Sequence, residues 1–491
     1  MATNAAEYNY TWNSNQTEDT SDEMASNNSD IPDETDDIEG TGLEITSDID
    51  LESETFDNFT GDGIAVIEDD ADVSLFEVEA TDNEDDGFEV RGLVSNANVE
   101  IEKSAFNTNG DDGIDVFGDN NTLSLFRVEA AFNTEAGGLG VDGTNNQFNI
   151  DLSEFEANQD GLVIPRTGLG NTFNISDSAF FDNTDDGIDI FGVENVFNLD
   201  SASSTGNAED GVEVDGSDNT ITAVTSLFAD NGGDGFGDDI TATGNEFTFT
   251  STSFRANGDD GFDIEGTDNT ITLSNISSDE NVEEGFEIDG RNNTVTINER
   301  SIFGDNGEDG FDVDFRGIGN TIEVTESGFR NNGDDGFDVF GRNNVITWDD
   351  VESFDNTEQG FETDGDENEI TITDSFLLSN GSSGFSFDLT GEGNQLVLSD
   401  SSVLMNDEDG IEVLGNENTI SVFDSEITDN GEWGLEVVGD SNIIEIDNTV
   451  FDSNGSGAIL LTGDNNTLDI SDSGLTMADI IDEGSNNEIT V

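Results

Sequence analysis

The chain has 491 residues, more than the about 250–300 at which one compact core usually stops growing, so it holds several domains or an array of repeats. Asp and Glu number 116 against 10 Lys and Arg, a formal net charge of −106 that excludes nucleic acid as a partner and disfavours an anionic membrane surface. The absence of Cys and His excludes disulfides and structural zinc sites.

The first 40 residues are rich in Asp, Glu, Asn, Ser and Thr and show no repeat, so we expect residues 1–40 to form a flexible acidic tail. They have neither the basic region nor the apolar region of a secretory signal peptide. The whole chain has no apolar run of about 18 residues, and we therefore expect no membrane insertion.

From residue 41 onward one pattern repeats. A glycine followed by an apolar–acidic–apolar triplet, which we call the marker glycine, recurs at steps of 23 to 26 residues. Apolar residues alternate with period two, which is typical of strands, and Gly, Asn, Asp and Ser separate three such strands in each repeat. The marker glycines are Gly63, Gly87, Gly113, Gly138, Gly161, Gly187, Gly211, Gly235, Gly261, Gly285, Gly310, Gly336, Gly360, Gly384, Gly410, Gly434 and Gly457.

Strands that recur in this way can stack in parallel, coil on coil, at about 4.8 Å. We predict an all-β chain whose residues 41–491 form a single parallel β-helix domain of about seventeen coils, each with 24–26 residues and three short strands. Two columns of Asn, represented by Asn219 and Asn183, are expected to form hydrogen-bonded ladders. The predicted inward columns are Phe262, Phe286, Phe311, Phe337 and Phe361; Ile271, Val295, Ile322, Ile346 and Ile370; and Phe254, Phe303, Phe329, Phe354 and Phe376.

The phrase Gly-x-x-Asn-Thr-Ile, at residues 216–221 and 266–271, resembles the repeat of the pectate-lyase-like superfamily. The resemblance covers roughly residues 55–491 and implies a right-handed parallel β-helix. That superfamily includes lyases, hydrolases, epimerases, phage tailspikes and surface proteins, so the resemblance implies a fold and not an activity.

Acidic residues cluster around the marker glycine. We call the acid two residues before it the first acid, the acid directly before it the second acid, and the acid two residues after it the third acid. Stacking puts like charges at about 4.8 Å from one another, which is destabilising without counter-ions. Examples of coils with all three acids are Asp111, Asp112 and Asp115; Asp185, Asp186 and Asp189; Asp259, Asp260 and Asp263; Glu308, Asp309 and Asp312; Asp334, Asp335 and Asp338; and Glu408, Asp409 and Glu412.

These columns predict bound calcium. Ca²⁺ takes about six to eight oxygen ligands in irregular geometry, whereas Mg²⁺ requires a strict octahedron and keeps its waters. Carboxylates from two neighbouring coils and a turn carbonyl could supply such ligands. We therefore predict several Ca²⁺ ions at these turns; the alternative is diffuse screening by monovalent cations in a salty, halophilic or marine environment.

Catalysis is not expected. Without His the chain cannot carry the Gly-His-Gly signature of β-helix pectin hydrolases, and only ten basic residues are available as a base. A two-carboxylate glycosidase stays open, because paired acids are its whole requirement. However, acid pairs occur in nearly every coil, so none stands out.

Some coils depart from the pattern. Residues 161–166 lose the acids and gain Pro165, and we interpret this as local variation in the counter-ion column. Arg291, Arg316 and Arg342 occur in three successive coils on one turn. We interpret them as neutralising local acids; the alternative is that they bind an anionic ligand.

Residues 484–491 are the second strand of one further coil, and an uncapped coil exposes strand edges that can pair with another chain. We therefore predict an extracellular or cell-surface structural protein, stabilised by calcium, whose partner is itself in a head-to-tail homopolymer. Surface polysaccharide is a further possible partner. The alternatives are a carbohydrate-binding or adhesive module and a β-helix enzyme that acts on polysaccharide.

Overall fold

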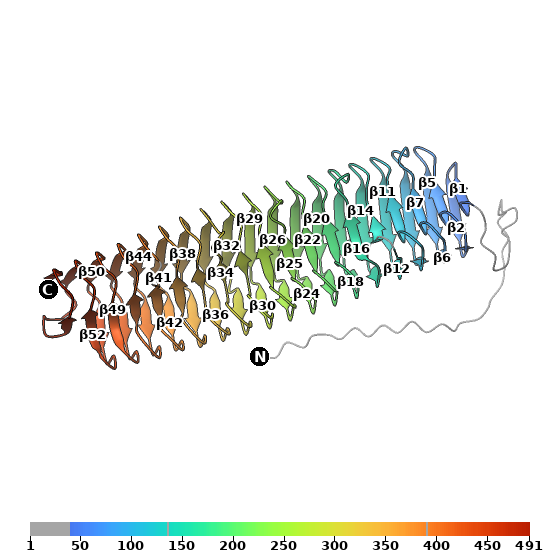
Figure 1. Cartoon of the computed structure of the whole chain (residues 1–491). Helices are drawn as coiled ribbons and strands as arrows, with labels where there is room; N and C mark the ends of the chain where they lie inside the picture. Colours follow the sequence, from blue (N-terminus) through green and yellow to red (C-terminus); the bar gives the residue numbers. More distant parts are fainter. Residues whose placement is uncertain (1–39, 135–136, 389–390) are drawn as a thin grey trace. The chain divides into compact units, whose positions relative to one another are not determined.

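A computed structural model describes residues 40–134, 137–388 and 391–491, and the predicted tail lies outside these residues except for Gly40. Within this part of the chain there are 55 strands and no helix, so no helix there could span a membrane. The strands follow one another in threes, coil after coil (Figure 1). In one coil they are β7 (Phe88–Val90), β8 (Asn98–Glu102) and β9 (Ala105–Asn107).

Each strand pairs in parallel with its equivalent in the next coil. β7 pairs with β10 (Ile114–Val116), β8 with β11 (Thr122–Phe126), and β9 with β12 (Glu129–Ala131). Three stacked sheets result, and they confirm the predicted parallel β-helix. In the described residues two sheets have nineteen strands and the third has seventeen, which agrees with about seventeen predicted coils.

The sheet that follows the marker glycines carries the candidate site, and we call it the marker sheet. It consists of a 13-stranded group and a 6-stranded group. The strands of the first group are β1 (Leu43–Ile45), β4 (Ile64–Val66), β7, β10, β13 (Gly137–Gly140), β16 (Asp160–Ile164), β19 (Ile188–Ile190), β22 (Val212–Val214), β25 (Phe236–Asp238), β28 (Phe262–Ile264), β31 (Glu287–Ile288), β34 (Asp312–Val313) and β37 (Asp338–Val339). The strands of the second group are β40 (Phe361–Thr363), β43 (Phe385–Phe387), β46 (Ile411–Val413), β49 (Trp433–Val437), β52 (Gly457–Leu461) and β54 (Ile480–Asp482).

The other two sheets complete each coil. The second sheet runs from β2 (Ile49–Glu52) to β55 (Glu488–Thr490), and the third runs from β3 (Thr55–Asp57) to β51 (Val450–Asp452). In all three sheets alternate residues point inward, because side chains of a strand alternate between its faces. The core therefore lies inside the coils as a continuous stack of apolar side chains.

Stacked phenylalanines fill much of this core. The rings of Phe311 and Phe337 lie 4.4 Å apart and nearly parallel, and Phe361 follows Phe337 at 5.0 Å. The predicted Phe column of the marker sheet is therefore confirmed. The Ile and Val column that begins at Ile271 is also fully buried.

The third predicted column is wrong at two positions. Phe254, Phe303 and Phe329 are buried, but the register then places Ser353 opposite Phe329. Phe354 and Phe376 point outward instead, and Phe376 is 42% exposed. A shift of one residue moves a side chain to the other face of a strand, and the turn before this strand hides that shift in the sequence.

Asparagine ladders join the coils as predicted. The side-chain oxygen of Asn293 accepts the backbone N–H of Asn269 at 2.8 Å. In the second ladder the side-chain amide of Asn257 donates to the side-chain oxygen of Asn281 at 3.0 Å. These buried amides satisfy turn backbone groups that sheet pairing leaves without partners.

Candidate cation-binding face

The third acid lies in a marker-sheet strand, between two apolar residues of the chain. Its neighbours on either side, such as Ile114 and Val116 around Asp115, are fully buried in the core. Alternation therefore turns the third acid outward. The first and second acids lie on the turn that leads into the same strand, so all three acids of a coil lie near one outer face.

Second acids form a hydrogen-bonded ladder along this face. Each uses one carboxylate oxygen to accept a backbone N–H of the next coil; for example, Asp260 accepts the N–H of Glu284 at 2.7 Å. The second acids are therefore structural as well as acidic. The equivalent bonds of the other predicted second acids are Asp112 to Gly137 at 2.5 Å, Asp186 to Asp210 at 2.7 Å, Asp309 to Asp335 at 2.5 Å, Asp335 to Gln359 at 2.5 Å and Asp409 to Trp433 at 2.6 Å.

Two of the predicted third acids are buried although they point outward. Asp115 is 4% exposed and Asp189 is 6% exposed. Within the described residues, one oxygen of each is buried without a hydrogen-bond partner, and the same holds for Asp263 and Asp312. A buried polar atom without a partner costs about 1–3 kcal/mol, and more when it is charged. These oxygens therefore lack the positive charge or donor that would stabilise them.

Neighbouring coils bring third acids together in register. Asp312 lies opposite Asp338 in the sheet, Asp263 opposite Glu287, and Glu412 opposite Glu436. Like charges directly opposite one another repel. The predicted column of third acids is therefore present in the structure.

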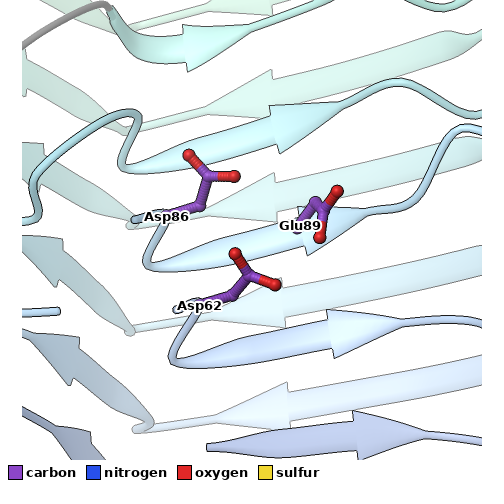
Figure 2. Close-up of side chains that lie close together, drawn as sticks. All are labelled: Asp62, Asp86 and Glu89. Carbon is purple, nitrogen blue, oxygen red and sulfur yellow. The ribbon is translucent and has the colours of Figure 1, made fainter. Parts of the chain in front are cut away.

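Three-carboxylate clusters form where second and third acids meet. One oxygen from each of Asp62, Asp86 and Glu89 lies within 4.8 Å of the other two, and Figure 2 shows these side chains on neighbouring turns and strands. Each cluster of this kind takes a second acid from one coil and a second and a third acid from the next. The equivalent clusters are Asp86, Asp112 and Asp115; and Asp160, Asp186 and Asp189.

First acids form a second kind of cluster. Asp111 groups with Asp85 and Asp86, and Asp185 groups with Asp186 and Glu209. Asp86 and Asp186 also belong to the clusters that contain a third acid, so the two kinds of cluster share a second acid. The other predicted first acids are exposed: Asp259, Glu308, Asp334 and Glu408.

Burial and like charge raise the pKa values of this face. The pKa of Asp115 rises to about 10, chiefly because of burial and then because of Asp112 and Asp86. The pKa of Asp189 rises to about 9, again chiefly because of burial and then because of the charge of Asp160. Burial likewise raises the pKa of Asp186 to about 10. A bound proton or a nearby cation would therefore stabilise each of these three side chains.

One cluster contains its own cation. The guanidinium of Arg91 pairs with Asp62 at 3.0 Å, Glu89 at 2.9 Å and Glu44 at 3.1 Å. The cluster of Asp160, Asp186 and Asp189 has no ion pair in the described part of the chain. The same arrangement of acids therefore occurs with and without a bound positive charge.

Sequence reasoning missed several members of these clusters. Asp62 and Asp160 lie in coils without a complete triplet, whereas Asp86 and Glu89 belong to a complete triplet with Asp85. The interpretation that the coil of Gly161 loses its acids is wrong, because Asp160 keeps the place of the second acid. Their positions relative to the marker glycine were the signal that could have found them.

Calcium fits the donor set better than magnesium does. Three carboxylates with oxygens within 4.8 Å of one another can bind a hard cation, and water can complete the about six to eight ligands of Ca²⁺. The second acids each hold one oxygen in the backbone ladder, which fixes the position of the carboxylate. Ca²⁺ tolerates irregular ligand arrangements, whereas Mg²⁺ requires a nearly ideal octahedron.

Comparison with known proteins defines the family. Residues 41–198 and 192–351 match the family model described as a right handed beta helix region, and the chain belongs to this family. The match confirms the predicted right-handed parallel β-helix and, for the fold, the resemblance to the pectate-lyase-like superfamily. No curated protein matches the chain.

Several solved structures are similar at low identity. A mutant of the periplasmic alginate epimerase AlgG is 12% identical over 65% of this chain and 78% of its own, with a TM-score of 0.40. The Dettilon tailspike protein is 12% identical over 64% and 62%, with a TM-score of 0.33. The A-module of the Azotobacter vinelandii mannuronan C-5 epimerase AlgE6 is 13% identical over 71% and 91%, with a TM-score of 0.27. At these values the likenesses carry no inference about activity.

Proposed function

We propose that this chain is a non-catalytic structural β-helix, stabilised by calcium along the marker sheet, that works outside the cell or at its surface. The buried, unpartnered oxygens of Asp115, Asp189, Asp263 and Asp312 carry the proposal. Each lies in a column of like charges, so a divalent cation there would offset both repulsion and burial. Extracellular modules commonly bind Ca²⁺ with dissociation constants of about 10⁻⁴–10⁻³ M, which suits such open sites.

Repetition of the clusters supports a structural role over a catalytic one. The same arrangement recurs at Asp62, at Asp86 and at Asp160 with their partners, so no single acid pair is set apart as a catalytic pair would be. An enzyme site normally departs from the regular pattern around it. The glycosidase alternative requires one such distinct pair.

Thermal unfolding of metal-stripped protein tests the calcium proposal. We expect millimolar CaCl₂ to raise the melting temperature well beyond NaCl of equal ionic strength, and MgCl₂ to have a smaller effect. Equal stabilisation by all three salts would mean diffuse screening and would sink the proposal.

A pair of variants localises the effect. Asp115→Asn with Asp189→Asn removes two third acids, so we expect a more stable metal-free protein and a smaller gain from calcium. The matched control is Asp218→Asn with Asp268→Asn, which removes two exposed acids from turns where Asn is well tolerated at positive φ. The control should keep the full calcium effect.

We further propose that copies associate end to end. In the described residues β1 pairs only with β4, and β55 pairs only with β53, so each of these strands has a free edge. Apolar side chains lie near one of these edges, including Ile481 at 45% exposure. Electron microscopy with and without calcium tests the proposal: filaments support it, and isolated particles in both conditions contradict it.

A further inference from the structure

An unusual pocket lies beside the marker sheet, on the turns that follow β31, β34 and β37. It has a volume of about 450 Å³, within the range of ligand pockets. Its lining includes Arg291, Arg316 and Arg342 together with Phe315 and Phe340. Three of the ten basic residues of a chain with 116 acids therefore meet in one place.

The backbone brings these residues together. Arg291 and Arg342 both pair with Ile318 through parallel β-bridges, so they lie on either side of one coil, about 10 Å apart at two strand spacings. In that middle coil the N–H of Gly317 donates to the carbonyl of Asp314 at 2.7 Å. This turn places Phe315 and Arg316 at its two central positions, where side chains point away from the coil.

Neutralisation of nearby acids accounts for only one of the three arginines. Arg316 pairs with Asp289 and lies 3.6 Å from Glu265, as the sequence interpretation expected. Arg291 and Arg342 are exposed and form no ion pair or side-chain hydrogen bond in the described part of the chain. Their charge is therefore available to a ligand.

Two aromatic rings form the apolar part of the pocket. Phe315 is 58% exposed and Phe340 is 46% exposed, with ring centroids 6.4 Å apart at an angle of 63°. The guanidinium of Arg316 lies 5.5 Å from the Phe315 ring. Exposed rings beside unpaired guanidinium groups match a ligand that joins an apolar ring face to an oxyanion. Asp366, also in the lining, could accept hydrogen bonds from the hydroxyl groups of a ligand.

We propose that this pocket binds an anionic saccharide, with Arg291 and Arg342 on its carboxylate or sulfate group and the two phenylalanines on the apolar face of a sugar ring. A purely inorganic anion would use the arginines but not the rings. A neutral sugar would use the rings but not the arginines. This binding is independent of the calcium clusters and would give the β-helix a polysaccharide partner at one defined place.

Isothermal titration calorimetry tests the proposal on the whole chain in millimolar calcium. The probes are a heparin-derived octasaccharide, an octagalacturonate, neutral maltooctaose and inorganic sulfate. We expect one charged octasaccharide or both to bind, and which of them binds assigns the sulfate or the carboxylate. Binding of maltooctaose or of sulfate as tightly as the charged octasaccharides, or binding of none of the four, would overturn the proposal.

Two surface variants locate the binding. Arg291→Gln with Arg342→Gln, and separately Phe315→Ser with Phe340→Ser, should each weaken binding at least tenfold. The control is Arg255→Gln with Arg300→Gln, which removes two exposed arginines outside the pocket and should leave binding unchanged. All four side chains of the test variants are exposed, and retained calcium-dependent melting shows that each variant is folded.

A calcium bridge between the acidic face and an anionic saccharide would give a different pattern. Binding would then disappear with a chelator but persist in the arginine variant. That result, or equal binding by the pocket variants and the control, would contradict the pocket.

Discussion

Two acid clusters on the marker sheet differ in one respect. Around Asp62 and Glu89 the guanidinium of Arg91 supplies the positive charge through three ion pairs. Around Asp160 and Asp189 the same arrangement of acids has no basic partner in the described residues, and one oxygen of Asp189 is buried without a hydrogen bond.

The difference shows what this face requires. The acids of both clusters hold the same positions relative to their marker glycines, so their placement does not depend on the basic residue. Where Arg91 is absent, something else must offset the repulsion. In the cluster of Asp62, Asp86 and Glu89, the guanidinium of Arg91 thus takes the place of the cation that we propose for the other clusters. This contrast gives a way to test the proposal.

Removal of calcium should produce the largest difference between the region around Arg91 and the region around Asp160. We expect chelation to increase amide hydrogen exchange in β16, β19 and β22 and to leave β4 protected. At a free calcium concentration of a hundred times the dissociation constant, one site adds about 2.7 kcal/mol to the free energy of unfolding. This stabilisation is lost when the ion is removed. Hydrogen exchange read by mass spectrometry measures it; equal deprotection of both regions would contradict the contrast.

Stability of the metal-free protein should fall as pH rises. The pKa values of Asp115 and Asp189 are raised to about 10 and about 9 in the fold, against an ordinary value of 3.8, so the folded state holds protons more tightly than the unfolded chain does. The resulting stabilisation is complete below about pH 4 and is lost as pH rises through about 9–10. Urea unfolding across this range measures it, and calcium should flatten the profile. Stability that increases with pH without metal would refute this account.

Substitution of Arg91 should make the cluster of Asp62, Asp86 and Glu89 depend on calcium, as we expect for the cluster of Asp160, Asp186 and Asp189. Arg91→Gln leaves Asp62 and Glu89 without a cation, and we expect a loss of about 1–2 kcal/mol, reduced from the cost of a fully buried pair because Arg91 is partly exposed. Added calcium should restore most of this loss. Calcium titrations of urea unfolding compare the variant with the original chain. A loss that calcium leaves unchanged would mean that Arg91 acts through packing.

The reverse substitution should have the smallest effect. Phe191 stands four residues after its marker glycine, as Arg91 does, in the coil that supplies Asp186 and Asp189 to their cluster. Phe191→Arg should therefore stabilise the metal-free protein by about 1 kcal/mol and reduce its gain from calcium. Phe191→Gln is the matched control, because it removes the ring without adding a charge. Equal behaviour of both variants would show that charge at this position has no effect.

Much of the fold could be predicted because the repeat carries its own register. The marker glycine, the period-two alternation and the Asn columns locate three strands per coil, and the structure has them. The error at Phe354 and Phe376 arose in a turn, where a shift of one residue leaves the composition unchanged but reverses the face. Sequence alone does not register strands across such a turn.

The candidate site was predicted only in part. Spacing identified the acid columns but not which acids share a cluster, because that depends on how the turn of one coil meets the strand of the next. The ion pair between Arg91 and Asp62, which are separated by more than one coil, was missed for this reason. Asp160 was missed although it directly precedes its marker glycine, because the rest of its coil departs from the acidic pattern. Burial of Asp115 and Asp189 was equally invisible, since an outward position in a strand is normally exposed.

The central claim is tested most directly by counting bound calcium. Equilibrium dialysis of the metal-stripped chain at physiological NaCl and millimolar free Ca²⁺, followed by atomic absorption, gives the number of ions per chain. We predict several, with fewer in the Asp115→Asn and Asp189→Asn double variant and an unchanged number in the Asp218→Asn and Asp268→Asn control. The contradicting result is an excess of calcium inside the dialysis bag that is no larger than the net charge of the chain alone would attract, and that is the same for all three proteins. It would mean that this face has no specific calcium sites.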